Sequence, residues 1–383
     1  MGYKKFFFRF LLAAVFVTAA LVLLAQLVAE VEFNSAQKLA DAYLWQKAEV
    51  KFKKSLASDP FNALHFAGYA DFLRSTAPYR ENEVVLLQKA EILYGRACEL
   101  DPMRAGYFLG SGAIKLKLHK FNEGLADLKR ALEKDPNGFN TAYEVGYRAI
   151  QAWQYLDDGF KALVIDRLRY ALVQKRWYWE HVYPIAWQST NDFTVLEQIA
   201  PDNVKAKKDL LYFVESNNLY QFRKRVVDAL NSVELKEDPQ GFEREQKEKI
   251  KNIEEIKKNT RGADVVTGDL WQGKSVGGKE YKDGNMYWSG TMYGVLNAAS
   301  GGAKLVIQAK GSPADNIYPY MIVGLEGKEI GEAFVNNDDW IEYSFLIKAG
   351  AGKKVLSVTF CNDGGNVEKN EDRNLYIGEA KIE

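Results

Sequence analysis

Asp-Pro dipeptides at residues 101–102 and 135–136 stand 34 residues apart, and each follows an apolar stretch that favours a helix. Proline lacks a backbone N–H and its ring clashes with the preceding turn, so each dipeptide is predicted to end a helix. A third Asp-Pro dipeptide, at 59–60, ends an earlier apolar stretch. A repeat of this length holds two helices, and such units bury their apolar faces only by stacking on one another. We therefore predict a helical solenoid over residues 31–232.

Small and aromatic residues recur at fixed distances before these prolines, where two helices must approach closely. They are Ala48 and Phe52 in the first unit, Ala90, Tyr94 and Ala97 in the second, Gly112 and Ala131 in the third, and Gly146 in a degenerate fourth. The stretch from residue 36 to about 177 resembles three or four tetratricopeptide repeats. The step between the first two units is 42 residues, which predicts an insertion near residues 75–78.

The resemblance implies a superhelix whose concave face binds peptides or partner proteins, and a spacer with an empty groove is an equal alternative. Basic and acidic residues balance at 51 each, so no global charge draws the chain to nucleic acid. The sequence shows no nucleophile–base pair and no phosphate-binding loop. We therefore predict a protein that is not an enzyme.

The N-terminus carries an uncharged run of 20 residues, Phe10 to Ala29, behind the basic residues Lys4, Lys5 and Arg9. As a helix this run is about 30 Å long, enough to cross a bilayer. The basic side should stay in the cytoplasm. Residues 1–30 therefore predict a single-pass inner (cytoplasmic) membrane protein with its bulk periplasmic or extracellular. The alternative is secretion after signal cleavage, although a signal-peptide core usually spans only about 7–15 residues.

Residues 233–262 are highly charged, with acidic and basic side chains at helical three- and four-residue steps. We predict an exposed helical linker there. After residue 262 glycine becomes frequent and helical patterns give way to alternation, as in Leu305, Ile307 and Ala309. Alternation between turn signals is typical of antiparallel strands. The predicted fold class is thus an α-solenoid followed by an all-β domain, a jelly-roll sandwich over residues 263–383.

The end of the chain carries a more specific pattern. The matching segments are 306–311, 319–321, 355–363 and 372–377. From Leu305 to Ile382 the sequence resembles the calcium-dependent, xylan-binding type of carbohydrate-binding module. The resemblance implies a jelly-roll sandwich that binds sugar through a Ca²⁺ ion. Loop carboxylates, backbone carbonyls and vicinal sugar hydroxyls would share that ion.

Carboxylate and amide oxygens gather near the end of this segment, and Ca²⁺ takes six to eight such ligands. By the resemblance, Asp363 and Asp372 are the expected ligands, with Glu371 and Asn362 as further candidates. Arg373 is expected to brace a carboxylate. A solvated turn is the alternative for this loop, since Asp, Asn and Gly are common turn formers.

The loop 364–370 departs from the pattern because it offers no aromatic residue for stacking on a sugar ring. Asn374, Trp340 and Tyr318 are the candidates for sugar contact, and Asn374 is also a weaker candidate for the metal. For Trp340 a place in the core of the sandwich is the favoured expectation.

Together these features predict a membrane-anchored, exported scaffold that binds protein partners through its repeats and a polysaccharide through calcium. Envelope or extracellular polysaccharide assembly, export or attachment is the expected setting. The alternative is a structural adaptor of a secretion or envelope complex, whose sandwich binds protein rather than sugar.

Overall fold

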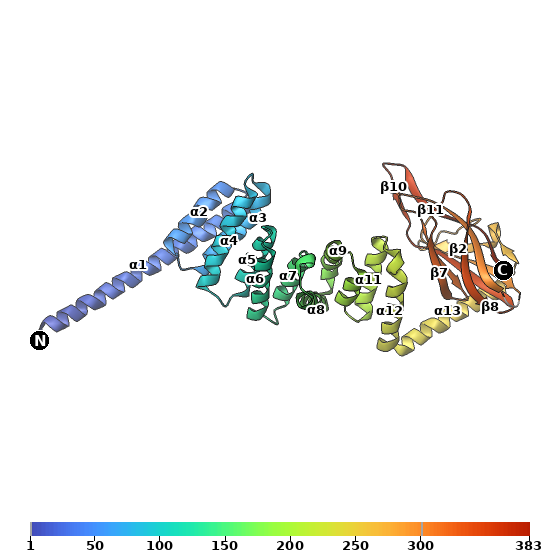
Figure 1. The fold of residues 1–383 in the computed structure, drawn as a ribbon, viewed down its shortest axis with the longest axis horizontal. Helices are drawn as coiled ribbons and strands as arrows, with labels where there is room; N and C mark the ends of the chain where they lie inside the picture. Colours follow the sequence, from blue (N-terminus) through green and yellow to red (C-terminus); the bar gives the residue numbers. More distant parts are fainter. Residues whose placement is uncertain (1, 300–301) are drawn as a thin grey trace. The chain divides into compact units, whose positions relative to one another are not determined.

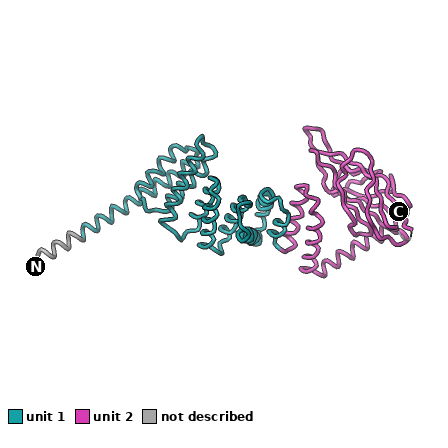
Figure 2. Tube along the Cα trace, viewed as in Figure 1, with its two compact units in different colours: residues 1–201 teal, residues 202–383 magenta. Residues whose placement is uncertain are grey.

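The computed structural model describes residues 2–299 and 302–383, with only the helical backbone for residues 2–11. The chain forms two compact units, residues 1–201 and residues 202–383 (Figure 2). The first unit is helical. The second contains three further helices and all the strands (Figure 1).

The helices of the first unit pack in consecutive pairs, α1 with α2, α3 with α4, α5 with α6, and α7 with α8. They are α1 (Gly2–Asp41), α2 (Trp45–Ser58), α3 (Ala63–Thr76), α4 (Glu83–Leu100), α5 (Ala105–Lys117), α6 (Phe121–Lys134), α7 (Phe139–Ile150), α8 (Asp158–Gln174), α9 (Trp179–Thr190) and α10 (Phe193–Ile199). Short 3-10 turns lie at η1 (Ala77–Tyr79), η2 (Trp153–Tyr155) and η3 (Arg176–Tyr178).

The repeat predicted from the Asp-Pro spacing is confirmed. Helices α2, α4 and α6 end at Ser58, Leu100 and Lys134, and each is capped by the aspartate of an Asp-Pro dipeptide. The short turn η1 lies between α3 and α4, where the longer step predicts an insertion. The solenoid is therefore built from helix pairs of the tetratricopeptide kind.

Helices α5 and α6 cross where two glycines face each other. A Cβ atom on Gly112 would lie 2.9 Å from the Gly124 carbonyl oxygen and 2.9 Å from a methyl carbon of Leu128. A Cβ atom on Gly124 would in turn lie 3.0 Å from the Gly112 carbonyl oxygen. Because backbone cannot give way as a side chain can, even one methyl group would push the helices apart.

We expect Gly112→Ala to destabilise the first unit by about 1–3 kcal/mol, the usual cost of overpacking. Gly106→Ala on the same helix is the matched control, because nothing lies within 4 Å of a Cβ atom there. That control should be neutral or should gain up to about 1 kcal/mol of helix propensity. Denaturant unfolding of both variants measures the difference, and equal effects would contradict the close helix contact.

Helix α1 continues without a break from the apolar run into the first helix pair. Ala29, Phe33 and Ala36 are buried, and the Phe33 ring fills the space that a Cβ atom on Gly68 would need. Within Leu12–Asp41 the helix is long and apolar enough to cross a membrane, and 6% of its most apolar window is buried in the structure. A signal sequence has the same properties.

The second unit begins with α11 (Val204–Ser216), η4 (Tyr220–Phe222), α12 (Arg223–Glu237) and α13 (Pro239–Asn259). Its strands are β1 (Val265–Val266), β2 (Gln272–Ser275), β3 (Asn285–Met286), β4 (Gly290–Ala298), β5 (Gly302–Ser312), β6 (Tyr320–Leu325), β7 (Lys328–Phe334), β8 (Ile341–Ala349), β9 (Gly352–Phe360), β10 (Gly364–Asn366) and β11 (Glu371–Ile382), with a 3-10 turn η5 (Gly268–Leu270).

The strands form two antiparallel sheets around one apolar core. The first sheet has the order β1-β11-β5-β8, with β3 and β10 also paired to β11, and the second has the order β2-β4-β9-β6-β7. Alternate residues of β5 and β9, such as Ile307 and Val358, are fully buried between the sheets. The predicted sandwich of antiparallel strands is confirmed.

Helices of the second unit cover the outer face of the second sheet. Ile253 of α13 packs on Val295 and Val355, and the Tyr220 ring of η4 stacks on Tyr320 with 4.1 Å between ring centroids. The Lys257 ammonium pairs with the Glu326 carboxylate at 2.5 Å. The charged segment predicted as an exposed linker is helix α13, exposed over most of its length and anchored to the sheet near its end.

Candidate functional site

The acidic loop folds back on itself as a hairpin. Strand β10 pairs with the start of β11, so that Gly364 lies opposite Arg373 and Gly365 opposite Asp372. Asn370, at the end of the turn, has a φ of 53°, and the Lys369 N–H donates to the Asn366 side chain at 3.1 Å. This hairpin extends beyond the rest of the sandwich (Figure 1).

The register brings three oxygen-bearing side chains to one face of the hairpin. Continuing the pairing by one residue sets Asp363 opposite Asn374, and Asp372 lies two residues from Asn374 on the same face. The Asn374 amide donates to the Asp372 carboxylate at 3.1 Å. The Asn374 Oδ1 atom is buried and has no hydrogen-bond partner within the described part of the chain.

The electrostatics agree with this proximity. Burial raises the pKa of Asp363, and the charge of Asp372 raises that pKa further. Backbone N–H donors at Gly364 and the contact with Ser289 act in the opposite direction. A cation bound beside Asp363 and Asp372, the acidic pair, would offset the repulsion that raises the pKa of Asp363.

Asn362 and Glu371 make other contacts. The Asn362 side chain is buried, accepts from the Tyr320 N–H at 2.5 Å and donates to the Tyr318 carbonyl at 2.9 Å. The Glu371 carboxylate accepts from the Asp315 N–H at 2.7 Å. Both side chains hold neighbouring loops in place.

Arg373 holds the base of the hairpin and is 7% exposed. Its guanidinium donates to the carbonyls of Ile317 at 2.7 Å, Asn362 at 2.5 Å and Ala314 at 2.9 Å. All three of these hydrogen-bond partners are backbone carbonyls rather than the carboxylate that the sequence led us to expect. The positive charge of Arg373 still acts on Asp363, whose pKa it lowers. The residue positions the acidic pair by fixing the backbone on both sides of it.

The aromatic candidates lie on different parts of the sandwich. Trp340 is 49% exposed, so the expected place in the core is wrong; its ring covers Gly378 on the outer face of the first sheet. Because Gly378 has no side chain, the Trp340 indole can lie against the outer face at that point. Tyr318 is half-buried next to the Asn362 anchor.

Sequence reasoning missed two exposed aromatic residues near the hairpin. Trp288 and Tyr287 are 39% and 42% exposed, and the next residue, Ser289, accepts a hydrogen bond from the Asp363 N–H at 3.2 Å. The carbonyl of Trp288 accepts from the buried Tyr281 hydroxyl at 2.7 Å. The consecutive residues Tyr287 and Trp288 were the signal that the sequence offered for these aromatic side chains. Their position beside Asp363 depends on the pairing of distant strands, which the sequence does not show.

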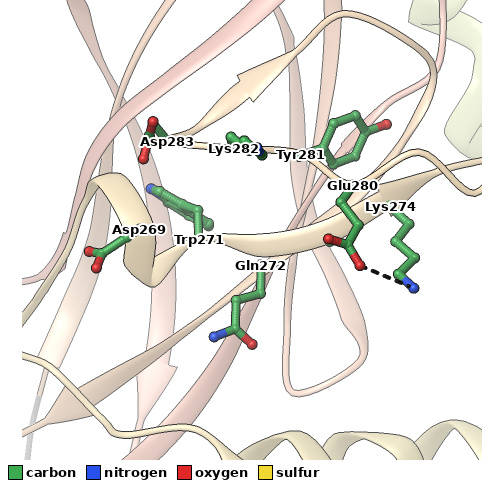
Figure 3. Close-up of a pocket in the computed structure, with 9 residues that line it drawn as sticks. Asp269, Trp271, Gln272, Lys274, Glu280, Tyr281, Lys282 and Asp283 are labelled. Atoms are coloured by element: carbon green, nitrogen blue, oxygen red, sulfur yellow. Dashed lines mark ion pairs between the residues drawn. The ribbon is translucent and has the colours of Figure 1, made fainter.

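A hollow of about 460 Å³ lies beside the edge strand β2 (Figure 3). Its lining residues are Asp269, Trp271, Gln272, Gly273, Lys274, Glu280, Tyr281, Lys282 and Asp283. The Lys274 ammonium and the Glu280 carboxylate form an ion pair at 3.5 Å, and the Trp271 indole donates to the Gly378 carbonyl at 3.0 Å. Asp363 and Asp372 are not among the lining residues, so the acidic pair is a surface feature separate from this hollow.

Within the residues that the structure describes, no three His, Cys, Asp or Glu side chains gather as a metal cage. A cation at the hairpin would therefore need amide and carbonyl oxygens besides the two carboxylates. Calcium accepts such mixed oxygen ligands in irregular geometry.

Residues 304–383 match the family CBM60, described as a Ca-dependent, xylan-binding carbohydrate-binding module. The matched segment begins in β5 and includes the hairpin and all of β11. No curated protein matches the chain.

Similar folds occur among solved structures. The TPR domain of Arabidopsis OM64 is 17% identical with a TM-score of 0.30, covering 34% of this chain and 99% of that one. YrrB, a TPR protein with an unusual peptide-binding site, is 18% identical with a TM-score of 0.34, covering 46% and 88%. The CBM36-1 domain of a multidomain xylanase from the hindgut metagenome of Trinervitermes trinervoides is 16% identical with a TM-score of 0.22, covering 31% and 90%.

Proposed function

We propose that this protein is a non-catalytic envelope scaffold whose terminal sandwich binds a polysaccharide through Ca²⁺. The apolar part of α1 would anchor it in the inner membrane, with the solenoid and the sandwich on the far side. The expected ligand is an envelope or extracellular polysaccharide, and the protein would take part in the assembly, export or attachment of that polysaccharide.

One observation supports the sugar-binding role above the others. In the matched segment the charges of Asp363 and Asp372 act on one another, beside the buried Oδ1 atom of Asn374, which has no hydrogen-bond partner among the described residues. We propose these three side chains as the calcium ligands, with Asn374 in place of the anchoring residues Asn362 and Glu371. The bound ion would supply two free coordination places for neighbouring hydroxyls of a sugar.

The solenoid would bind protein partners. A hollow of about 400 Å³ between α5 and η2 includes Lys117, Arg148 and Tyr155 in its lining, and the Arg148 guanidinium already pairs with Glu144 at 2.6 Å. The Tyr155 ring is 47% exposed and stacks on Phe121 with 3.8 Å between ring centroids. Cationic and aromatic side chains together suit a peptide that carries carboxylates.

Glycan-array binding by the full chain in detergent micelles, with Ca²⁺ and with excess EDTA, tests the sugar-binding role. We expect retention of at least one polysaccharide that falls at least about tenfold with EDTA, the change that 1.4 kcal/mol represents. Asp372→Asn should give the same loss without chelator. Retention that ignores both changes, or no retention at all, would favour the protein-binding adaptor.

A further inference from the structure

The outer face of the first sheet carries a continuous band of aromatic rings and lysines. Lys310 on β5 lies between two rings, with its ammonium 5.0 Å from the Trp340 centroid and 5.5 Å from the Tyr376 centroid. The Tyr376 ring contacts the Tyr287 ring edge-on at 6.0 Å, and Tyr287 contacts Trp288 in the same way at 6.0 Å. The band ends at Lys279, whose ammonium lies 3.9 Å from the Trp288 centroid.

The band crosses the sheet from the start of β8, over β5 and β11, to the residues that follow β3. Neighbouring strands lie about 4.8 Å apart, so three strand steps span roughly 14 Å. The second sheet buries its outer face under the unit's own helices, whereas the rings of this band are 39–49% exposed at Trp288, Tyr287 and Trp340. The length suits several consecutive sugar rings of a chain rather than a chain end.

Lys310 and Lys279 add positive charge to the band. Neither Lys310 nor Lys279 forms an ion pair with any residue that the structure describes, whereas Lys274 nearby pairs with Glu280 and Lys381 on β11 with Glu383. An ammonium above an aromatic ring is held in place and keeps donors for an anion. A ligand with carboxylates spaced along an otherwise uncharged chain would complement this arrangement.

The band is continuous with the calcium edge, which consists of the proposed ligands Asp363, Asp372 and Asn374. Asp372, Asn374 and Tyr376 alternate along β11, so all three belong to the outer face. Tyr376 is four residues from Asp372, or roughly 13 Å at the usual rise of a strand.

We propose that this face binds an acidic polysaccharide chain, a polyuronate, with sugar rings packed on Trp340, Tyr376 and Tyr287 and carboxylates paired with Lys310 and Lys279. The inference rests on the proposed sugar-binding role and extends it from one sugar at the calcium edge to a length of chain. Packing of sugar C–H groups on the rings removes apolar area from water. The charge pairs select uronates over neutral sugars.

The test uses the full chain in micelles on an array of polymers of glucuronate, galacturonate and mannuronate. Each polymer is printed as long chains, as disaccharides and in its carboxyl-reduced, neutral form. We expect at least one long acidic chain to bind at least about tenfold tighter than its neutral form, and Lys310→Gln to remove about that factor. Trp340→Ala should weaken long chains and leave disaccharides unchanged. Lys274→Gln, which removes a lysine already paired with Glu280, is the matched control and should change nothing.

EDTA separates this inference from the calcium mechanism. If Lys310→Gln and Trp340→Ala bind like wild type while EDTA still abolishes binding, the chain-binding face is overturned and the proposed calcium site at Asp363, Asp372 and Asn374 still stands. Persistence of both effects in EDTA would support the face even if the calcium edge fails. Equal binding of acidic and neutral chains, or retention of none, would overturn the proposal.

Discussion

Replacing Arg373 with methionine should destabilise the sandwich by about 3 kcal/mol or more. Hydrogen bonds from a charged donor contribute about 1.5–3 kcal/mol each, and this guanidinium makes three. Methionine fills similar space but donates nothing, so the carbonyl of the buried Asn362 would lose the bond from Arg373. The Ala314 carbonyl would keep only the bond from the Ile317 N–H at 3.0 Å. Burial lowers the pKa of Arg373 without depriving it of its donors, since the group stays charged far above neutral pH.

Hydrogen exchange of the full chain measures this effect where it arises. Amides of residues 314–317 and of the hairpin should lose protection first, while those of the helix pairs in the first unit stay protected. Lys381→Met on the same strand is the control, because that side chain is 41% exposed and forms a surface ion pair. Unchanged protection in Arg373→Met would show that the three bonds do not hold the loops.

The helical half of the fold follows from local rules. Proline positions and small residues at a 34-residue period predict the helix pairs because each signal acts within one repeat. The facing of Gly112 and Gly124 is the structural reason for the small residue at position 112. Helix α13 also follows from its charge spacing, but its anchoring through Ile253 depends on a strand partner about a hundred residues later.

The site could be predicted only in part, because its geometry depends on register. The sequence singles out Asp363 and Asp372 through their motif, and the hairpin pairing brings them to one face. The sequence does not distinguish Asn374 from Asn362, since both are amides beside acidic residues, and only the contacts show that Asn362 is an anchor. The ring of Trp340 is exposed because Gly378 opens a place on the outer face, a relation across strands that alternation does not reveal.

Asp363→Asn should abolish calcium binding and, in the absence of metal, make the sandwich more stable. Burial and the charge of Asp372 raise the pKa of Asp363 above its ordinary value. The folded, metal-free protein therefore holds that proton more tightly than the unfolded chain does. Its stability rises as pH falls toward and through the raised pKa, and at neutral pH the ionised carboxylate is a cost. Asparagine removes that charge and also removes one of the proposed Ca²⁺ ligands.

Thermal unfolding of the full chain with EDTA and with Ca²⁺ separates the two effects. The wild type should gain melting temperature on adding Ca²⁺, and the gain should fade as pH drops through the raised pKa, because a proton then competes with the ion. Asp363→Asn should melt higher than wild type in EDTA and gain nothing from Ca²⁺. Glu368→Gln, which removes an exposed carboxylate from the tip of the same hairpin, should behave as wild type. A variant at residue 363 that melts lower in EDTA would mean that its carboxylate stabilises the fold itself, and a calcium response retained by that variant would exclude Asp363 as a ligand.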